Sequence, residues 1–275
     1  ERAWLLPLVI AGLFLFVSLA MFVYPLGYGF DTFIHQTTIE HIAEHGTITP
    51  KPFYYIGQYS AELFASQAFH LPLNIVDRLL LPLLTALFLP LAWYFAFFHL
   101  AENRRAAMFS VLGVFLIPLA GFIVTTPQGM ANLWTVLIIL LSIPILKGQR
   151  EVSLTALFIL TLTALAIHPL AGIPIMLYFA LIATPYRAIK IPTIIFGSLV
   201  LPLAFLISSK LSGLTMSFDW SSLSPSRLLE SFNLEVFLSN RYDAILDFVY
   251  LYGFNTTLIL VVLSGIAILV FRRDL

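Results

Sequence analysis

Long stretches without any charged residue constrain this sequence more than its other features do. Six such stretches lack Asp, Glu, Lys and Arg, and they cover residues 3–30, 79–101, 106–146, 152–186, 191–209 and 248–271. A helix needs about 20 apolar residues to cross the hydrocarbon core of a bilayer. The stretches are continuously apolar rather than alternating, which favours helices over the strands of a barrel. The sequence therefore predicts an all-α, polytopic membrane protein.

Two of these stretches are too long for one crossing, and each has a cluster of helix-breaking residues near its middle. Residues 125–129 read TTPQG, and residues 168–172 read HPLAG. Proline lacks a backbone donor and glycine loosens the backbone, so both clusters predict a turn at a membrane face. Eight spans result, at about residues 4–24, 79–99, 106–125, 131–146, 152–168, 170–184, 192–209 and 255–271.

The scarcity of charge excludes several classes of protein. Charged residues make up 10% of the chain, and the 14 basic and 14 acidic residues cancel, whereas a soluble domain carries about 25% charge. A soluble globule, a disordered chain and a nucleic-acid partner are therefore excluded. A disulfide scaffold is excluded because the chain has no cysteine. The lack of ionisable groups within the spans argues against a proton-coupled transporter or a voltage sensor.

The basic residues indicate the orientation of the chain. Nine of them lie at one set of span ends, in very short connections or near the termini, and five lie at the other set. Because positive charge in short segments favours the cytoplasmic side, we predict that both termini are cytoplasmic. Two long segments, about residues 25–78 and 210–254, then lie on the outer face. We expect residues 1–275 to form a single membrane-embedded domain of a longer chain, in a prokaryotic plasma membrane.

The first outer segment carries the clearest local pattern. Asp31 is in the position of an N-cap, a helical stretch follows over residues 32–45, and Gly46 is suited to the C-cap. At 100° per residue, His35, Thr38, Ile42 and His45 share a stripe with Asp31, as in an amphipathic helix on a membrane surface. Residues 47–55 are extended and aromatic, and residues 60–69 are predicted to form a second surface helix.

This layout resembles that of the C-type (GT-C) membrane glycosyltransferases, which use sugars linked to a lipid phosphate. The residues that carry the resemblance are Asp31, in the segment GFDTFIH at residues 29–35, and the aromatic segment YYIGQYS at residues 54–60. Two surface helices between the first and second spans complete the pattern. Unlike many members of that family, this chain has Thr32 rather than a second acidic residue after Asp31.

The resemblance implies inverting transfer of a sugar from a polyprenyl-phosphate donor to a glycan, lipid or protein acceptor on the outer face. Asp31 would be the general base, and cations would bind the leaving phosphate. The alternative for Asp31 is that it only caps a surface helix. The residues expected to bind substrate are His35, Lys51, Tyr54, Tyr55, Gln128, His168, Arg227 and Arg241. The sequence specifies no cofactor, and a divalent metal at Asp31 and His35 stays open.

Three alternatives from other classes remain. The first is a transporter or flippase of a lipid-linked saccharide, and the second is a non-catalytic scaffold subunit of the membrane. The third is a zinc hydrolase, because residues 41–45 read HIAEH, which has the H-x-x-E-H spacing of a metallopeptidase helix. For the pair Asp77 and Arg78, the sequence favours a salt bridge at the end of a span.

Overall fold

The computed structural model describes residues 4–23, 27–29, 31–117, 119–149, 151–184 and 192, and the regular structure within these ranges is helical. The chain divides into two compact units, Glu1–Phe115 with Gly121–Leu199, and Leu116–Ala120 with Val200–Leu275. Almost all of the second unit lies outside the described residues. So do the predicted spans at 192–209 (apart from Pro192) and 255–271, together with Arg227 and Arg241.

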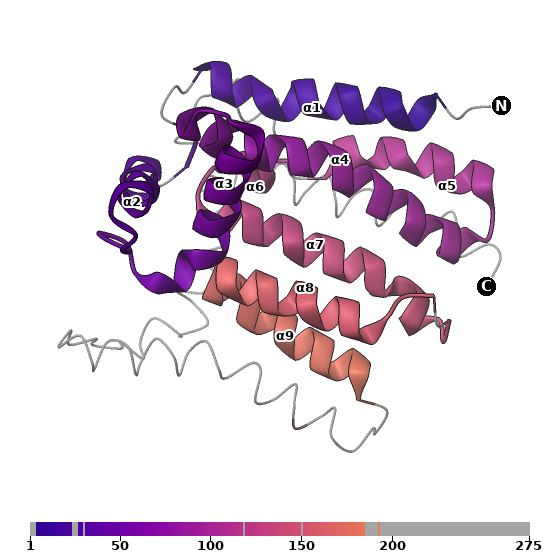
Figure 1. Ribbon diagram of the computed structural model, residues 1–275. Coiled ribbons are helices and arrows are strands. Elements are labelled where there is room, and N and C mark those ends of the chain that lie inside the picture. Colours follow the sequence, from indigo (N-terminus) through magenta and orange to yellow (C-terminus); the bar gives the residue numbers. More distant parts are fainter. Residues whose placement is uncertain are drawn as a thin grey trace, which may run out of the picture. The chain divides into compact units, whose positions relative to one another are not determined.

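Five helices of the first unit run alongside one another as a bundle (Figure 1). They are α1 (Leu5–Val23), α4 (Leu73–Ala101), α7 (Pro127–Leu146), α8 (Leu154–Ile167) and α9 (Pro169–Ala183). Helix α4 packs between α1 and α7, and α7 packs on α8 and α9. A core of Ile138, Leu157, Ala164 and Ile175 joins the last three helices.

Three helices of this bundle are long and apolar enough to cross a membrane. Helix α1 has 19 residues, α4 has 29 and α7 has 20. These three helices indicate an integral membrane protein, in agreement with the charge-free stretches. Helices α8 and α9 are apolar but shorter, with 14 and 15 residues.

The expected span at residues 106–125 is not one continuous helix. Its place is taken by α5 (Arg104–Ser110), a 3₁₀ helix η2 (Val111–Leu116) and the short α6 (Ala120–Ile123). Gly113 and Pro118 interrupt the apolar run in the sequence. Glycine is a poor helix former and proline removes a backbone donor, so apolarity alone did not predict this break.

Both breaker clusters end one helix and begin the next, as predicted; the first break is shorter than expected, and the second has a single residue, as expected. Helix α7 begins at Pro127 and α9 begins at Pro169, with His168 as the single residue between α8 and α9. Proline is favoured at the first helical position, where its missing N–H would have had no partner within the helix. Gln128 therefore lies in the first turn of α7 rather than in a loop.

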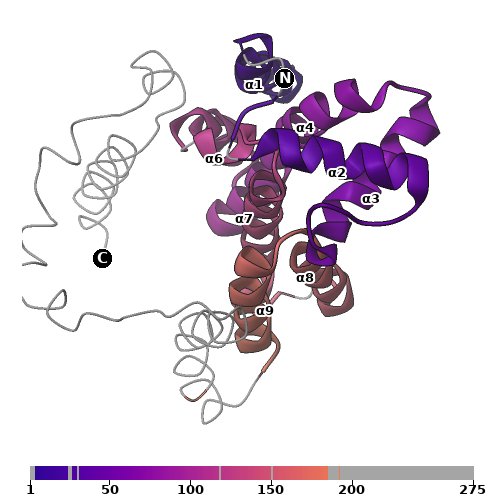
Figure 2. The ribbon, with the colours of Figure 1, turned by 90° about the vertical axis from the view of Figure 1, so that its left-hand side faces the viewer.

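The first outer segment lies at one end of the bundle, where α2 (Thr32–His45) and α3 (Ile56–Phe69) cross the ends of the long helices (Figures 1 and 2). The bounds of α2 and its C-cap at Gly46 confirm the prediction. Helix α3 begins earlier than the predicted residue 60, after a 3₁₀ turn η1 (Phe53–Tyr55). The buried side chains of α2 include His35 and Thr38, whereas His45 is exposed.

Two close approaches fix this end of the bundle. A Cβ atom on Gly57 would lie 2.7 Å from the backbone of Ala166 and Ile167, so α3 touches the last turn of α8 without an intervening side chain. Gly27 has a φ of +88°, and a Cβ there would lie 2.4 Å from Thr125 Oγ1. The nearby backbone of Tyr28 accepts a hydrogen bond of 2.9 Å from Thr125 N.

We predict that Gly57→Ala destabilises the protein, because the added methyl group meets backbone atoms that cannot rotate away. Overpacking of this kind typically costs about 1–3 kcal/mol. The measurement is the thermal unfolding midpoint in detergent. Gly12→Ala in α1 is the matched control, since its Cβ would lie 3.7 Å from Phe115, an ordinary contact. Equal midpoints for the two variants would contradict the close contact of α3 with α8.

Candidate functional site

Asp31 and Lys51 form an ion pair at the start of α2. Lys51 Nζ lies 3.1 Å from Asp31 Oδ2, and the side chains are 18% and 44% exposed, respectively. Asp31 occupies the N-cap position, but its side chain makes no capping hydrogen bond, so the prediction of a side-chain cap is wrong. Its backbone is left-handed, with φ 60° and ψ 21°, and this geometry leaves the carboxylate for Lys51.

The loop after α2 brings Lys51 back to this helix. The backbone N–H of Lys51 donates to Thr38 Oγ1 at 3.3 Å, and that hydroxyl donates to the carbonyl of Ile34 at 2.7 Å. Thr38 is fully buried in the middle of α2. Anchored at this point, the lysine side chain extends toward the N-terminal end of α2 and reaches Asp31.

Beside the ion pair, His35 is buried against α3. Its Nδ1 lies 2.7 Å from the hydroxyl of Tyr59, and both residues are among the most buried of this segment, at 6% and 0% exposed. The His35 ring meets the Tyr55 ring edge-on, with centroids 5.2 Å apart. Tyr54 contacts Tyr55 in turn, at 4.6 Å.

Burial and charge keep the His35 imidazole neutral near pH 7. Desolvation is the larger cause and Lys51 the next, and together with a weaker effect of His168 they lower the pKa of His35 to about 4, against an opposing effect of Asp31. A neutral imidazole has one donor and one acceptor nitrogen, so the group can relay a hydrogen bond without carrying charge.

His168 completes this group from the far side of Tyr55. It lies between α8 and α9, only 9% exposed, and its ring centroid is 5.3 Å from that of Tyr55. Its Nδ1 is buried and makes no hydrogen bond within the described residues. A buried nitrogen without a partner carries a desolvation cost unless another molecule bonds to it, so this atom is a candidate ligand contact.

The structure thus brings together six of the predicted site residues: Asp31, His35, Lys51, Tyr54, Tyr55 and His168. His168 joins the other five through its contact with Tyr55. Gln128 is exposed and donates to Asn132 Oδ1 at 2.9 Å. No contact between Gln128 and the other site residues is described. Arg227 and Arg241 lie outside the described residues, so their roles stay predictions.

A second polar group lies beneath α3 and was not predicted. Gln58 and Glu62 are 2% and 1% exposed, and the Gln58 amide donates to Glu62 Oε1 and, at 2.7 Å, to the carbonyl of Thr125. The Glu62 carboxyl lies close enough to that of Asp77, which is 5% exposed on α4, for the charge of Asp77 to act on it. Burial, and next the charge of Asp77, raise the pKa of Glu62 well above its usual range.

These buried residues had a signal in the sequence. Tyr55, Gln58, Tyr59 and Glu62 follow the i, i+3, i+4, i+7 spacing of one helix face. Because that face is polar, it reads as a solvated surface unless a partner is known to cover it. The charge of Arg78 acts on Asp77, and so does the neighbouring Glu62 carboxyl. The salt bridge between Asp77 and Arg78 stays a prediction.

The described residues give no support to a metal held by Asp31 and His35 or by the HIAEH segment. They contain no group of three or more His, Cys, Asp or Glu side chains arranged to hold a metal ion. His41 and His45 stack on each other, with centroids 4.3 Å apart, and His41 Nε2 lies 3.1 Å from Thr47 Oγ1. The zinc-hydrolase alternative therefore lacks a third ligand in this part of the chain.

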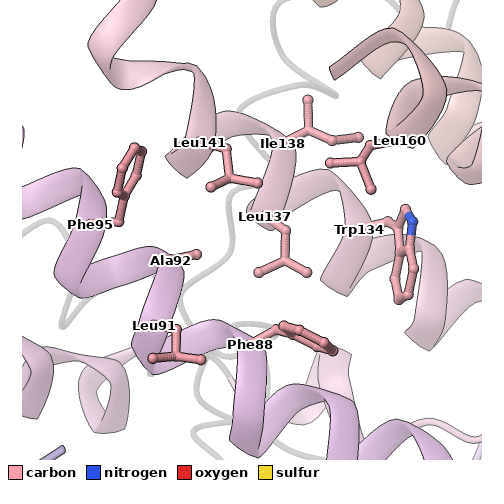
Figure 3. A pocket seen from close by; sticks show the side chains of 9 residues that line it. All are labelled: Phe88, Leu91, Ala92, Phe95, Trp134, Leu137, Ile138, Leu141 and Leu160. Atoms are coloured by element: carbon pink, nitrogen blue, oxygen red, sulfur yellow. The ribbon is translucent and has the colours of Figure 1, made fainter. Parts of the chain in front are cut away.

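An apolar pocket of about 430 Å³ lies between α4, α7 and α8 (Figure 3). The residues that line it are Phe88, Leu91, Ala92, Phe95, Trp134, Leu137, Ile138, Leu141 and Leu160. Leu160 is eight residues before His168 on α8, a distance of about 12 Å at about 1.5 Å per residue. The pocket therefore lies within the depth of the candidate spans rather than at their ends.

The opposite end of the bundle carries its own polar contacts. Lys147 Nζ donates to the carbonyl of His99 at 2.7 Å and lies 3.0 Å from Glu102 Oε1, while His99 Nε2 lies 3.2 Å from Glu151 Oε2. These contacts join the α4–α5 connection to the α7–α8 connection. The two short connections that were predicted to be cytoplasmic therefore lie together.

Comparison with known proteins identifies no relative of this chain. The sequence matches no known protein family, and neither a curated protein nor a solved structure is significantly similar to it.

The low pKa of His35 predicts a pH dependence of stability. The unfolded chain takes up a proton on this residue near its ordinary pKa of 6.5, whereas the folded chain does so only near pH 4. Stability from this group is therefore complete above about pH 6.5 and is lost as the pH falls toward 4. The measurement is the unfolding midpoint of the parent and of His35→Gln between pH 7.5 and 4.5.

The difference between the two proteins isolates His35 from other titrating groups. This matters because the raised pKa of Glu62 acts in the opposite direction, favouring the folded state at low pH. We expect the parent to lose stability relative to His35→Gln as the pH falls. Parallel curves would show that His35 is not held neutral by the fold.

Proposed function

We propose that this chain is a GT-C-like membrane glycosyltransferase with eight spans and both termini in the cytoplasm. The donor is a sugar linked to a polyprenyl phosphate, and transfer to a glycan, lipid or protein acceptor takes place on the outer face of a prokaryotic plasma membrane. The observation that carries the proposal is the Asp31–Lys51 ion pair, placed beside a wall of aromatic and histidine side chains at one end of the bundle.

The ion pair supplies the two charges that inverting transfer needs. Asp31 accepts the proton of the acceptor hydroxyl as the oxygen attacks the anomeric carbon. The new bond joins acceptor oxygen to that carbon, and the bond from the carbon to the phosphate oxygen breaks with its electron pair. The departing polyprenyl phosphate keeps the negative charge, which Lys51 stabilises. Arg227 and Arg241 are proposed as further phosphate contacts.

The neighbouring rings suit the recognition of a sugar. Tyr54 is 41% exposed, while Tyr55 lies between it and the two histidines, so the rings form a surface beside the carboxylate. His168 packs against Tyr55, and we propose it as a further side chain of this surface. His35 is neutral, so it positions the Tyr59 hydroxyl without competing with Asp31 for charge. Gln128 is proposed as a more distant polar contact.

Two apolar features support a lipid-linked donor. The pocket between α4, α7 and α8 is lined by hydrocarbon side chains and could accommodate part of an isoprenoid tail (Figure 3). The first outer segment also carries large aromatic side chains that are each more than half exposed: Phe33, Phe53, Phe64 and Phe69. Aromatic side chains on interfacial helices insert at the boundary between headgroups and acyl chains.

The first test is turnover by purified protein in lipid nanodiscs, supplied with a panel of polyprenyl-phosphate sugars. We expect release of polyprenyl phosphate by the parent. Asp31→Asn should slow this release by about 10²-fold or more, because the amide cannot accept the proton. Glu44→Gln is the control, since Glu44 lies on the same helix with its side chain 73% exposed.

The possible outcomes test the glycosyltransferase activity and the role of Asp31 separately. Release from no donor, with a folded parent, would overturn the glycosyltransferase and favour a transporter or scaffold. If the Asp31→Asn variant releases polyprenyl phosphate as fast as the parent, the transferase activity is supported but Asp31 is not its general base.

The second test concerns the orientation, and the absence of cysteine makes it direct. Ala43 on α2 and Ala101 at the end of α4 are both exposed, and each is replaced singly by cysteine in cells. A membrane-impermeant maleimide should label Ala43→Cys from outside and Ala101→Cys only after permeabilisation. The reverse pattern would invert the topology, and outside labelling of both would contradict a span at α4.

A further inference from the structure

The group formed by Gln58, Glu62 and Asp77 lies apart from the proposed reaction and has no role in it. Its side chains come from α3 and α4, and all three are at least nine-tenths buried. Two buried carboxyl groups near each other, such as Glu62 and Asp77, repel each other strongly when both are ionised. Something must therefore neutralise them, either a shared proton or a bound cation.

The unpaired atoms of this group distinguish a shared proton from a bound cation. Glu62 Oε2 and Gln58 Oε1 are both buried and make no hydrogen bond within the described residues. A proton shared with Asp77 provides a partner for Glu62 Oε2 but leaves Gln58 Oε1 without one. Reversing the amide does not help, because its oxygen would then face the Thr125 carbonyl and Glu62 Oε1.

A cation gives a partner to both atoms. Carboxylate and side-chain amide oxygens are the ligands that Ca²⁺, Mg²⁺ and Mn²⁺ prefer. The charges around the group also fit a divalent ion, because Glu40 and Arg78 are the other charged groups that act on Asp77. With Glu62 and Asp77 ionised, these four residues carry a net charge of −2, which one divalent cation cancels.

We propose that Gln58, Glu62 and Asp77 form a site for one divalent metal ion between α3 and α4. The Glu62 and Asp77 carboxylates and the Gln58 amide oxygen are its protein ligands, and water supplies the rest, as is common for Mg²⁺ and Mn²⁺. The ion is structural: it fastens the helix that bears Tyr59 to the long helix α4.

The experiment uses Mn²⁺ as the probe and the full chain in nanodiscs near pH 7.5. Bound Mn²⁺ is counted by the loss of the electron paramagnetic resonance signal of the free ion. We expect about one ion per chain, with affinity at least about tenfold weaker in Glu62→Gln and in Asp77→Asn. Both substitutions keep the side-chain shape and remove a charge, so the fold is expected to persist.

Two controls make the result specific to this site. Glu44→Gln removes an exposed carboxylate, and His45→Gln breaks the exposed pair with His41, so both should bind Mn²⁺ like the parent. A parent that binds no Mn²⁺ would overturn the proposal in favour of a shared proton. Binding that Glu62→Gln and Asp77→Asn leave unchanged, or that His45→Gln abolishes, would also overturn it. Because only binding is measured, the outcome does not depend on transferase activity.

Discussion

The docking of α3 onto the bundle is the contact on which the outer end of the described structure depends. Gln58 donates to the carbonyl of Thr125 before α7, and Gly57 lies against the last turn of α8. The same helix packs on α2 and α4. One short helix thus contacts α2, α4, α8 and the segment before α7, in part through hydrogen bonds, which are directional. Its rotation or translation would separate His35 from Tyr59 and Tyr55 from His168.

The parts of the fold that follow from short-range rules could be predicted from the sequence. The start and end of α2 followed from Asp31 and Gly46, and the breaks before α7 and α9 followed from Pro127 and Pro169. The stretch at residues 106–125 was not predicted correctly, because hydropathy measures the preference for lipid and not the continuity of backbone hydrogen bonds. Helices α8 and α9 are apolar, as expected, yet shorter than a typical span.

The candidate site was predictable in its residue types but not in its pairing. Asp31 and His35 stood out because they flank the start of a surface helix. The partnership of Asp31 with Lys51 joins residues 20 positions apart through a loop, and no local periodicity reports such a contact. Glu62 was missed for a related reason: a carboxylate on an amphipathic helix is usually solvated, and only the approach of α4 buries this one.

The left-handed backbone of Asp31 has a consequence for the variation that this position tolerates. Aspartate, asparagine and glycine adopt a positive φ readily, whereas β-branched side chains do so at considerable cost. Position 31 is therefore restricted in two ways. The positive φ limits which residues the fold accepts, and the contact with Lys51 calls for a negative charge. In a library of all twenty amino acids, variants that fold would cluster on a few small or polar residues. Among the three residues just named, aspartate alone would retain the carboxylate facing Lys51.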